Sequence, residues 1–470
     1  MPTLCYDSRQ HDPQNETNFL LVTRKCCEPM PLTSDVALAA RRHIALRLLP
    51  FVFLLYVVAY LDRANVSFAA LRMNFDLGFS DRVYGLGVAM FYLGYVLFEI
   101  PGAIIVERWS ARKWTARIMI SWGVATIFSG LVHTAAQFYA ARFFLGLAEA
   151  SFFPGMIVYL THWFRLCDRG RAVAVLYTAV PVSAVIGSPL AGWLLGIGWR
   201  GLPGWRWIFF LEGVPAIALG VVALFYMTDW PREAQWLAPE EREWISNELD
   251  AEKRAKKEIR SFTIWEALRD PHTLSLAVPY MVASTGLACI VFWLPTFAKR
   301  LSGLPDSRVT LWVMLPPLAG LLGLIFNGWH SDKTGERRWH TLIPMACTGL
   351  GYLLAIPASA NFPLVMVLFT IAGFFMYAHF PPLWAMPTMV LSESAAAAAF
   401  GLINGVGHVG GFFGPYIIGD LNTRTHSLLP GFAFIAACYL VGALLVLRVK
   451  VRNPIVERPS LALPYAAAKN

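Results

Sequence analysis

Charged side chains inside apolar segments are the residues of this sequence best suited to chemistry. Asp62 and Arg63 follow the apolar run 51–61, and Arg142 and Glu149 are seven residues apart in another apolar run. A separation of seven places two side chains on one helix face, about 10 Å apart along the axis. An ionisable group near the centre of a membrane costs on the order of 2.5–3.5 kcal/mol, so it is retained mainly where it is paired or lines a cavity. For Asp62 and Arg63, the alternative is a place at the end of a short helix.

These two cations and two carboxylates favour coupled binding of an anion and a proton. Asp62 and Arg63 are neighbours about 100° apart on a helix, so each needs a partner from another helix. Our hypothesis is that Arg63 and Arg142 attract an anion, while Asp62 and Glu149 alternate between pairing with these arginines and carrying a proton. Burial favours the neutral carboxyl and a nearby arginine favours the carboxylate, so filling the anion site changes which protonation state is stable. No redox or covalent step is needed.

Aromatic and amide side chains on other apolar segments are further candidates. Tyr92, Tyr95 and Glu99 share one helix face, where both substrate contact and packing between helices remain open. In the second half we select Trp384 and Asn404 as substrate contacts, in preference to the nearby histidines. The first half therefore holds the ionic groups, and the second offers mainly aromatics and amides.

The composition and the spacing of apolar runs indicate a membrane protein. Of 470 residues, 57% are hydrophobic and 15% charged, which is more apolar side chain than a water-facing protein can bury. Runs of about 20 mostly apolar residues occur twelve times, six on each side of one polar break. We expect an all-α integral membrane protein of twelve transmembrane helices, at 44–70, 83–106, 114–134, 137–160, 170–196, 207–228, 273–297, 308–329, 340–358, 363–386, 394–419 and 431–449.

Lysine and arginine gather in three short connections between these segments, and basic connections are retained on the cytoplasmic side. The formal charge of +9 therefore reflects membrane orientation, and we expect no nucleic-acid partner. The seven cysteines have neither a disulfide framework nor metal-ligand spacing, so we expect no metal and no cofactor. The predicted domains are a cytoplasmic tail (1–43), a six-helix bundle (44–228), a cytoplasmic linker with an amphipathic helix (229–272), a second six-helix bundle (273–450) and a cytoplasmic tail (451–470).

The two halves repeat a loop motif of acid, base, any, small, any, base, base and Trp, at 107–114 and 332–339. A Gly-Pro match in the fifth helix of each half has nearly the same offset, which favours a six-plus-six duplication. The charged motif residues lie at helix ends, where they can act as a conformational latch between bundles or simply set orientation. The latch candidates are Glu107, Arg108, Arg112, Asp332, Arg337 and Arg338.

Over about residues 41–452 the chain resembles the anion:cation symporter family of the major facilitator superfamily. The matching stretches are YLDRAN (60–65), FEIPG (98–102), RFFLGLAEA (142–150), FPG (153–155) and GWRWIFFLEG (204–213). The resemblance implies a fold of two pseudo-symmetric six-helix bundles. It also implies proton-coupling roles for Asp62 and Glu149, anion-binding and coupling roles for Arg63 and Arg142, and a substrate site lined by Tyr60, Tyr95, Trp384 and Asn404.

The same resemblance implies proton-coupled symport of a small organic anion, such as a sugar acid, a dicarboxylate or an aromatic carboxylate. Glu107, Ala111 and His408 stand where the family usually has Asp, Gly and Asn, which leaves the particular substrate open. The alternatives are an exporter or exchanger of another metabolite within the superfamily, or a membrane sensor that does not transport. The sequence has no nucleophile paired with a base and no metal cluster, so we do not expect an enzyme. We expect a monomer in the lipid bilayer of a bacterial inner membrane, with both termini in the cytoplasm.

Overall fold

The structure is a computed structural model that describes residues 35–257, 271–390 and 393–449, and within these ranges the secondary structure is helical, with no strand. The predicted terminal tails lie mostly outside the described residues, as does the end of the predicted linker. The side chains of a few residues inside helices are also outside the described set, among them the latch candidates Glu107 and Arg108.

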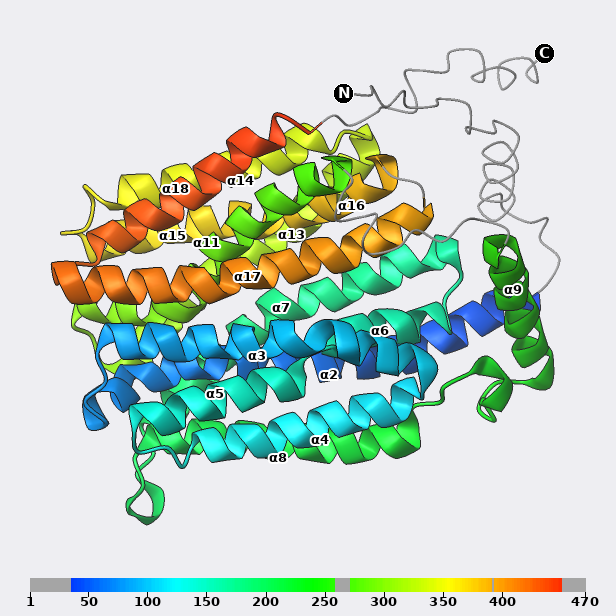
Figure 1. The fold of residues 1–470 in the computed structure, drawn as a ribbon, viewed down its shortest axis with the longest axis horizontal. Helices are drawn as coiled ribbons and strands as arrows, with labels where there is room; N and C mark the ends of the chain where they lie inside the picture. Colours follow the sequence, from blue (N-terminus) through cyan, green and yellow to red (C-terminus); the bar gives the residue numbers. More distant parts are fainter. Residues whose placement is uncertain (1–34, 258–270, 391–392, 450–470) are drawn as a thin grey trace, which may run out of the picture.

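The helices form two bundles whose axes run roughly parallel (Figure 1). The first bundle consists of α2 (Asp35–Asp76), α3 (Asp81–Arg108), α4 (Ala111–Ser129), α5 (Ala135–Glu149), α6 (Phe152–Thr161), α7 (Leu166–Leu195) and α8 (Gly204–Tyr226). The second consists of α11 (Pro271–Ser302), α12 (Asp306–Val313), α13 (Leu315–Thr334), α14 (Arg338–Ala355), α15 (Phe362–Ala378), α16 (Phe380–Val390), α17 (Glu393–Thr425) and α18 (Leu429–Val446).

The described helices supply twelve crossings of the bundle pair. Eight stretches are long and apolar enough to span a membrane, and three of them are broken helix pairs, α5 with α6, α12 with α13 and α15 with α16. The long helices α3, α4, α14 and α17 run beside them and complete six crossings in each bundle (Figure 1). The expected all-α architecture of two six-helix bundles is confirmed.

Helix α2 begins nine residues before the predicted first span, inside the segment expected to be tail. Its first turns are held by contacts with the rest of the first bundle and with α9 (Pro239–Lys257), a helix at one end of the molecule. Arg41 pairs with Asp168 at the start of α7, and His43 Nδ1 lies 2.8 Å from Glu241 Oε1 of α9. These polar contacts favour a helix that continues beyond the apolar run.

The two bundles meet mainly where α3 lies beside α17 and where α2 and α7 lie beside α11, α12 and α13 (Figure 1). The α3–α17 contact is close enough to require glycine. A Cβ at Gly85 would lie 2.6 Å from the Pro415 carbonyl oxygen. The end of the molecule opposite α9, where α2 ends at Asp76 and α3 begins at Asp81, is called the far end. The end that carries α9 is called the α9 end.

Candidate functional site

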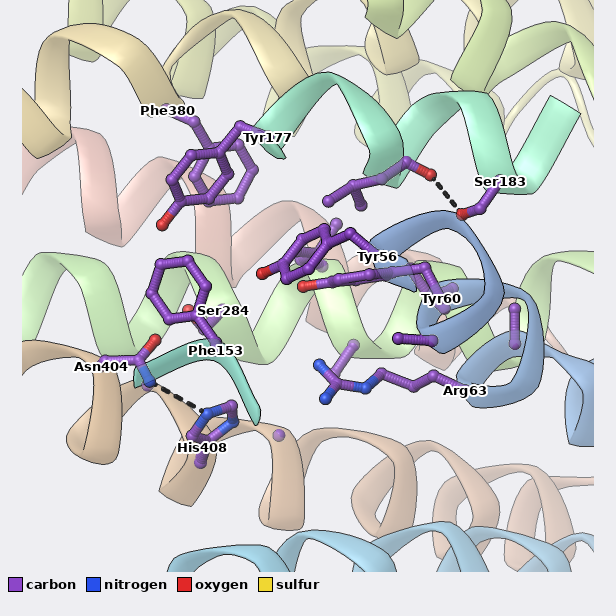
Figure 2. Close-up of a pocket in the computed structure, with 18 of the residues that line it drawn as sticks. Tyr56, Tyr60, Arg63, Phe153, Tyr177, Ser183, Ser284, Phe380, Asn404 and His408 are labelled. Carbon is purple, nitrogen blue, oxygen red and sulfur yellow. Dashed lines mark hydrogen bonds between the residues drawn. The ribbon is translucent and has the colours of Figure 1, made fainter. Parts of the chain in front are cut away.

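A cavity lies between the two bundles, with helices of both contributing to its wall. Figure 2 shows Arg63 of α2 on one side and Asn404 and His408 of α17 on another. The charged residues in its lining are Arg63 and Glu149, together with the imidazole of His408. Most of the remaining polar wall is phenolic, from Tyr56, Tyr60, Tyr92, Tyr95, Tyr177, Tyr280 and Tyr377.

Arg63 and Glu149 form an ion pair at this wall. The Arg63 guanidinium lies 4.9 Å from the centre of the Tyr60 ring and 5.3 Å from that of Tyr95, which holds its flat face between aromatic groups. Glu149 is 1% exposed, and its second oxygen has no hydrogen-bond partner among the described residues. Because both residues line the cavity, Arg63 can exchange Glu149 for another anion that enters it.

A break between α5 and α6 sets the position of Glu149. Helix α5 ends at Glu149, and Ser151 adopts a left-handed backbone with φ of 68° before α6 begins. A non-glycine residue in this region stores strain, which is typical of functional sites. The Trp114 Nε1–H donates a hydrogen bond of 3.2 Å to Ser151 Oγ and fixes the break.

Arg142 lies behind the cavity wall and does not line it. Its side chain is fully buried, and none of its three guanidinium nitrogens has a hydrogen-bond partner in the described part of the chain. The guanidinium lies 4.8 Å from the centre of the Phe91 ring, and that of Arg63 lies 5.5 Å from the same ring. Arg142 is therefore a buried cation held close to the ion pair without contacting it directly.

Asp62 is also buried behind the wall. It accepts hydrogen bonds from Thr126 Oγ of α4 at 2.8 Å and from Asn65 Nδ2 at 2.9 Å. Glu212 of α8 is buried as well, and its Oε2 has no partner among the described residues. The first bundle thus contains a second group of buried carboxyls apart from the one at the cavity.

Across the cavity, Asn404 and His408 of α17 meet Glu99 of α3. Asn404 Nδ2 donates a hydrogen bond of 2.6 Å to Glu99 Oε1 and lies 3.3 Å from His408 Nε2. The His408 ring lies 4.4 Å from the ring of Tyr95, centre to centre. These contacts join the two bundles beside the cavity.

The structure separates the predicted site residues into two layers. Tyr60, Arg63, Tyr95, Glu149 and Asn404 line the cavity. Asp62 and Arg142 lie behind the wall of the first bundle, and Trp384 of α16 packs against Tyr280, with ring centres 4.9 Å apart. The roles assigned to these residues remain predictions.

Several residues of the site were not selected from the sequence. Tyr56 could have been found, because it is one helical turn from Tyr60. Tyr177 and Tyr280 give no such signal, since each is a lone tyrosine in a long apolar helix and enters the site only through helix packing. The sequence leaves the role of Glu99 open and favours Asn404 over His408. The contact between Glu99 and His408 depends on the meeting of two bundles, which the sequence does not show.

The two ends of the molecule differ in their ion pairs. At the far end, Asp306 of α12 pairs with Arg72 of α2 and lies 2.7 Å from Lys299 Nζ, and Arg300 of α11 pairs with Asp81 of α3. The Arg72–Asp306 and Arg300–Asp81 pairs join the bundles.

At the α9 end, the described latch candidates pair within their own bundle or with the segment that leads to α9. Asp332 Oδ1 in the last turn of α13 lies 2.6 Å from Arg337 Nη1 just before α14, and Arg338 donates to the Leu447 carbonyl. The Arg112 backbone N–H donates 2.9 Å to Asp229 Oδ1. The latch role remains a prediction.

Comparisons with known proteins point to one family. The model of the Major Facilitator Superfamily matches residues 52–415 and, in a second match, 302–462. The chain is 42% identical to a protein of Agrobacterium vitis named "Putative tartrate transporter", over 88% of this chain and 96% of that one. It is 33% identical to the "Quinolone resistance transporter" of Acinetobacter baumannii, over 86% of this chain and 93% of that one.

A solved structure of similar fold is a bacterial homolog of the human lysosomal transporter Spinster, in an inward-facing and unoccupied conformation. The two chains superpose with a TM-score of 0.66 at 18% identity, covering 87% of this chain and 95% of that one. At this identity the similarity concerns the fold alone.

Proposed function

The chain belongs to the Major Facilitator Superfamily, and we propose that it takes up a small organic anion together with protons, by alternating access of one central cavity. The observation that carries this proposal is the Arg63–Glu149 ion pair at the wall of a cavity between two bundles. An arginine matches a carboxylate in geometry and charge. The identity to a protein named as a tartrate transporter supports an organic anion as cargo.

Substrate and proton are coupled through exchange at Arg63. When a substrate carboxylate binds Arg63, it displaces Glu149 from its cation. A buried carboxylate without a cation is unstable, so the displaced Glu149 takes up a proton. When the substrate leaves, Arg63 recovers Glu149, and the proton is released on the same side. Both species therefore move in the same direction.

Arg142 and Asp62 extend this coupling behind the wall. Arg142 lies close to the Arg63–Glu149 pair across the Phe91 ring, and it has no direct anionic partner among the described residues. A change of charge on Glu149 alters the electrostatic field at Asp62 as well as at Arg142, and with it the stability of the Asp62 carboxylate. This gives the second buried carboxyl a part in proton binding without any contact with substrate.

We place the α9 end in the cytoplasm of a bacterial cell and the far end outside its inner membrane. Basic residues of the α4, α7 and α14 ends, among them Arg112, Arg165 and Arg337, lie at the α9 end, as the positive-inside rule expects. With twelve crossings, the first helix begins and the last ends on this side. The ion pairs between bundles at the far end support an inward-facing conformation, with the outer side closed.

The proposal is tested by uptake into liposomes that contain the purified protein. Radiolabelled tartrate, gluconate, succinate and benzoate are each added with and without an inward proton gradient. We expect at least one acid to accumulate, and accumulation to rise severalfold with the gradient. Glu149→Gln is expected to abolish gradient-driven accumulation, because an amide cannot carry the proton. Arg142→Ala is expected to lose the coupling as well.

The matched control is the exposed ion pair between Asp250 of α9 and Arg232, which precedes α9. Asp250→Asn removes an ion-paired carboxylate far from the cavity and should leave accumulation unchanged. Uptake of an acid that ignores the gradient in both wild type and Glu149→Gln would refute the proton coupling. Uptake of no acid at all would refute the choice of cargo.

Export of an aromatic compound is the second candidate function. It is favoured by the tyrosine-rich lining of the cavity and by the identity to a protein named as a quinolone resistance transporter. Cells that express an exporter should contain less of a fluorescent quinolone than control cells. If export uses the Glu149 carboxyl, the Glu149→Gln variant should not lower the quinolone content. The absence of any change in quinolone content would eliminate it.

A further inference from the structure

The polar contact between Glu99, Asn404 and His408 determines which hydrogen-bonding groups of the second bundle are available to a substrate. Glu99 comes from α3 and the other two from α17, so the group forms only where the bundles meet. Glu99 is 6% exposed and lies behind the cavity wall, whereas Asn404 and His408 line the cavity.

The orientation of the Asn404 amide follows from its partners. Asn404 Nδ2 donates a hydrogen bond of 2.6 Å to Glu99 Oε1, so the amide nitrogen faces the Glu99 carboxyl group and the amide oxygen does not. The same nitrogen lies 3.3 Å from His408 Nε2, which therefore accepts its second hydrogen. Both amide hydrogens are engaged, and His408 carries its own proton on Nδ1.

The Asn404 carbonyl oxygen is thereby left as the group available to a substrate. In Figure 2 the nitrogen of Asn404 points to His408 and the oxygen points away from it. This oxygen can accept a hydrogen bond, but it repels a carboxylate or another carbonyl. On the opposite wall, Arg63 attracts a carboxylate and offers donors only. The two sides of the cavity are therefore complementary to different ends of one molecule.

We infer that Glu99 is a positioning residue that makes the cavity selective for hydroxylated acids, with the substrate carboxylate at Arg63 and a substrate hydroxyl donating to Asn404 Oδ1. This inference rests on the proposed function and specifies its substrate class. A site built to accept a hydrogen bond from a hydroxyl discriminates against the analogue that lacks it, because the site's polar group is then left unpaired. Unsubstituted aliphatic acids are accordingly poor substrates.

The test compares acids that differ only in their hydroxyl groups. Uptake of labelled tartrate and succinate, and of labelled gluconate and hexanoate, is measured with the purified full-length protein in liposomes. We expect wild type to prefer the hydroxylated member by about tenfold or more in Vmax/KM, the effect of one good hydrogen bond. The preference should lie mainly in KM.

Glu99→Gln retains the size of the side chain but can both donate and accept, so the Asn404 amide is free to turn over. We expect the preference to fall at least threefold in this variant, and to vanish in Asn404→Leu, which removes the accepting oxygen. Thr285→Val is the matched control, because Thr285 packs against Gly410 and Gly414 in the same α11–α17 contact and does not line the cavity. It should retain the wild-type preference.

The outcomes separate this inference from the proposed function. Equal uptake of both members of each pair by wild type would overturn the inference alone, since organic acids would still be transported. An unchanged preference in Glu99→Gln, with only the maximal rate reduced, would likewise overturn it and leave Glu99 with a structural role. Failure of wild type to take up any acid would overturn the proposed function and this inference together.

Discussion

Asp62 and Glu149 are both buried carboxylates, yet their surroundings differ. Glu149 pairs with Arg63 at the cavity wall, so a substrate can displace it directly. Asp62 is satisfied by two neutral donors, Thr126 and Asn65, and does not line the cavity. At the scale of single residues, we therefore propose a division of labour in which both carboxyls bind protons and one of them also responds to substrate.

This division predicts the effect of Asp62→Asn. Proton-driven accumulation should be lost, because the amide cannot exchange a proton. The dissociation constant for the transported acid should change less than about threefold, since residue 62 makes no contact with the cavity. Equilibrium binding and accumulation in liposomes measure the two quantities. Thr126→Val, which keeps the carboxyl, should retain accumulation, and a tenfold loss of affinity in Asp62→Asn would contradict the division.

At the scale of helices, the approach of α5 to α3 positions the charged residues. A Cβ added at Gly146 would overlap the Phe91 carbonyl oxygen, so the two backbones are in direct contact there. Gly146 lies between Arg142 and Glu149 on α5, and Phe91 carries the ring near both guanidinium groups. The absence of a side chain at Gly146 thus sets how closely Arg142 and Glu149 of α5 approach Phe91 of α3.

Gly146→Ala is expected to force the two helices apart and destabilise the protein by about 1–3 kcal/mol, as overpacking does elsewhere. The thermal midpoint of the purified protein should fall, and substrate affinity should fall with it because Glu149 moves relative to Arg63. Gly170→Ala on α7 is the control, since nothing lies within 4 Å of its added Cβ. It should melt at or slightly above the wild-type temperature. Equal midpoints for the two variants would show that the α3–α5 contact tolerates a methyl group.

At the scale of the whole molecule, the ion pairs at the far end hold the two bundles together. Asp306 is 5% exposed and serves both Arg72 of the first bundle and Lys299 of its own. Removing one member of such a buried group leaves the remaining charges without a partner. The contact between the two bundles at the far end therefore depends on a small number of carboxylates.

Asp306→Asn is expected to open the far end more often and to expose the cavity to the outside. The reporter is Ser284→Cys at the cavity wall, in a protein whose seven native cysteines are replaced. A thiol reagent that cannot cross the membrane, added to intact cells, should label it severalfold faster in the Asp306→Asn variant. Asp250→Asn on α9 should leave the labelling rate unchanged. If the labelling rate does not increase even in the double variant Asp306→Asn/Asp81→Asn, these ion pairs do not hold the far end closed.

The sequence by itself determined the helical membrane fold and the twelve segments in two halves, and it selected Arg63 and Glu149, which the structure brings together at the cavity wall. These features follow from local properties, since apolar runs need a bilayer and an isolated charge within one needs a partner. Repetition of a loop motif was sufficient to show the duplication.

Only the tertiary structure decided which buried groups line the cavity. Asp62 and Arg63 are adjacent in sequence and lie in different layers, because one residue of rotation on a helix turns a side chain by about 100°. Trp384 lies behind Tyr280, and Glu99 meets Asn404 across 305 residues of sequence. Contacts of this kind depend on the rotation and approach of packed helices from different bundles, which the pattern within a single segment does not encode.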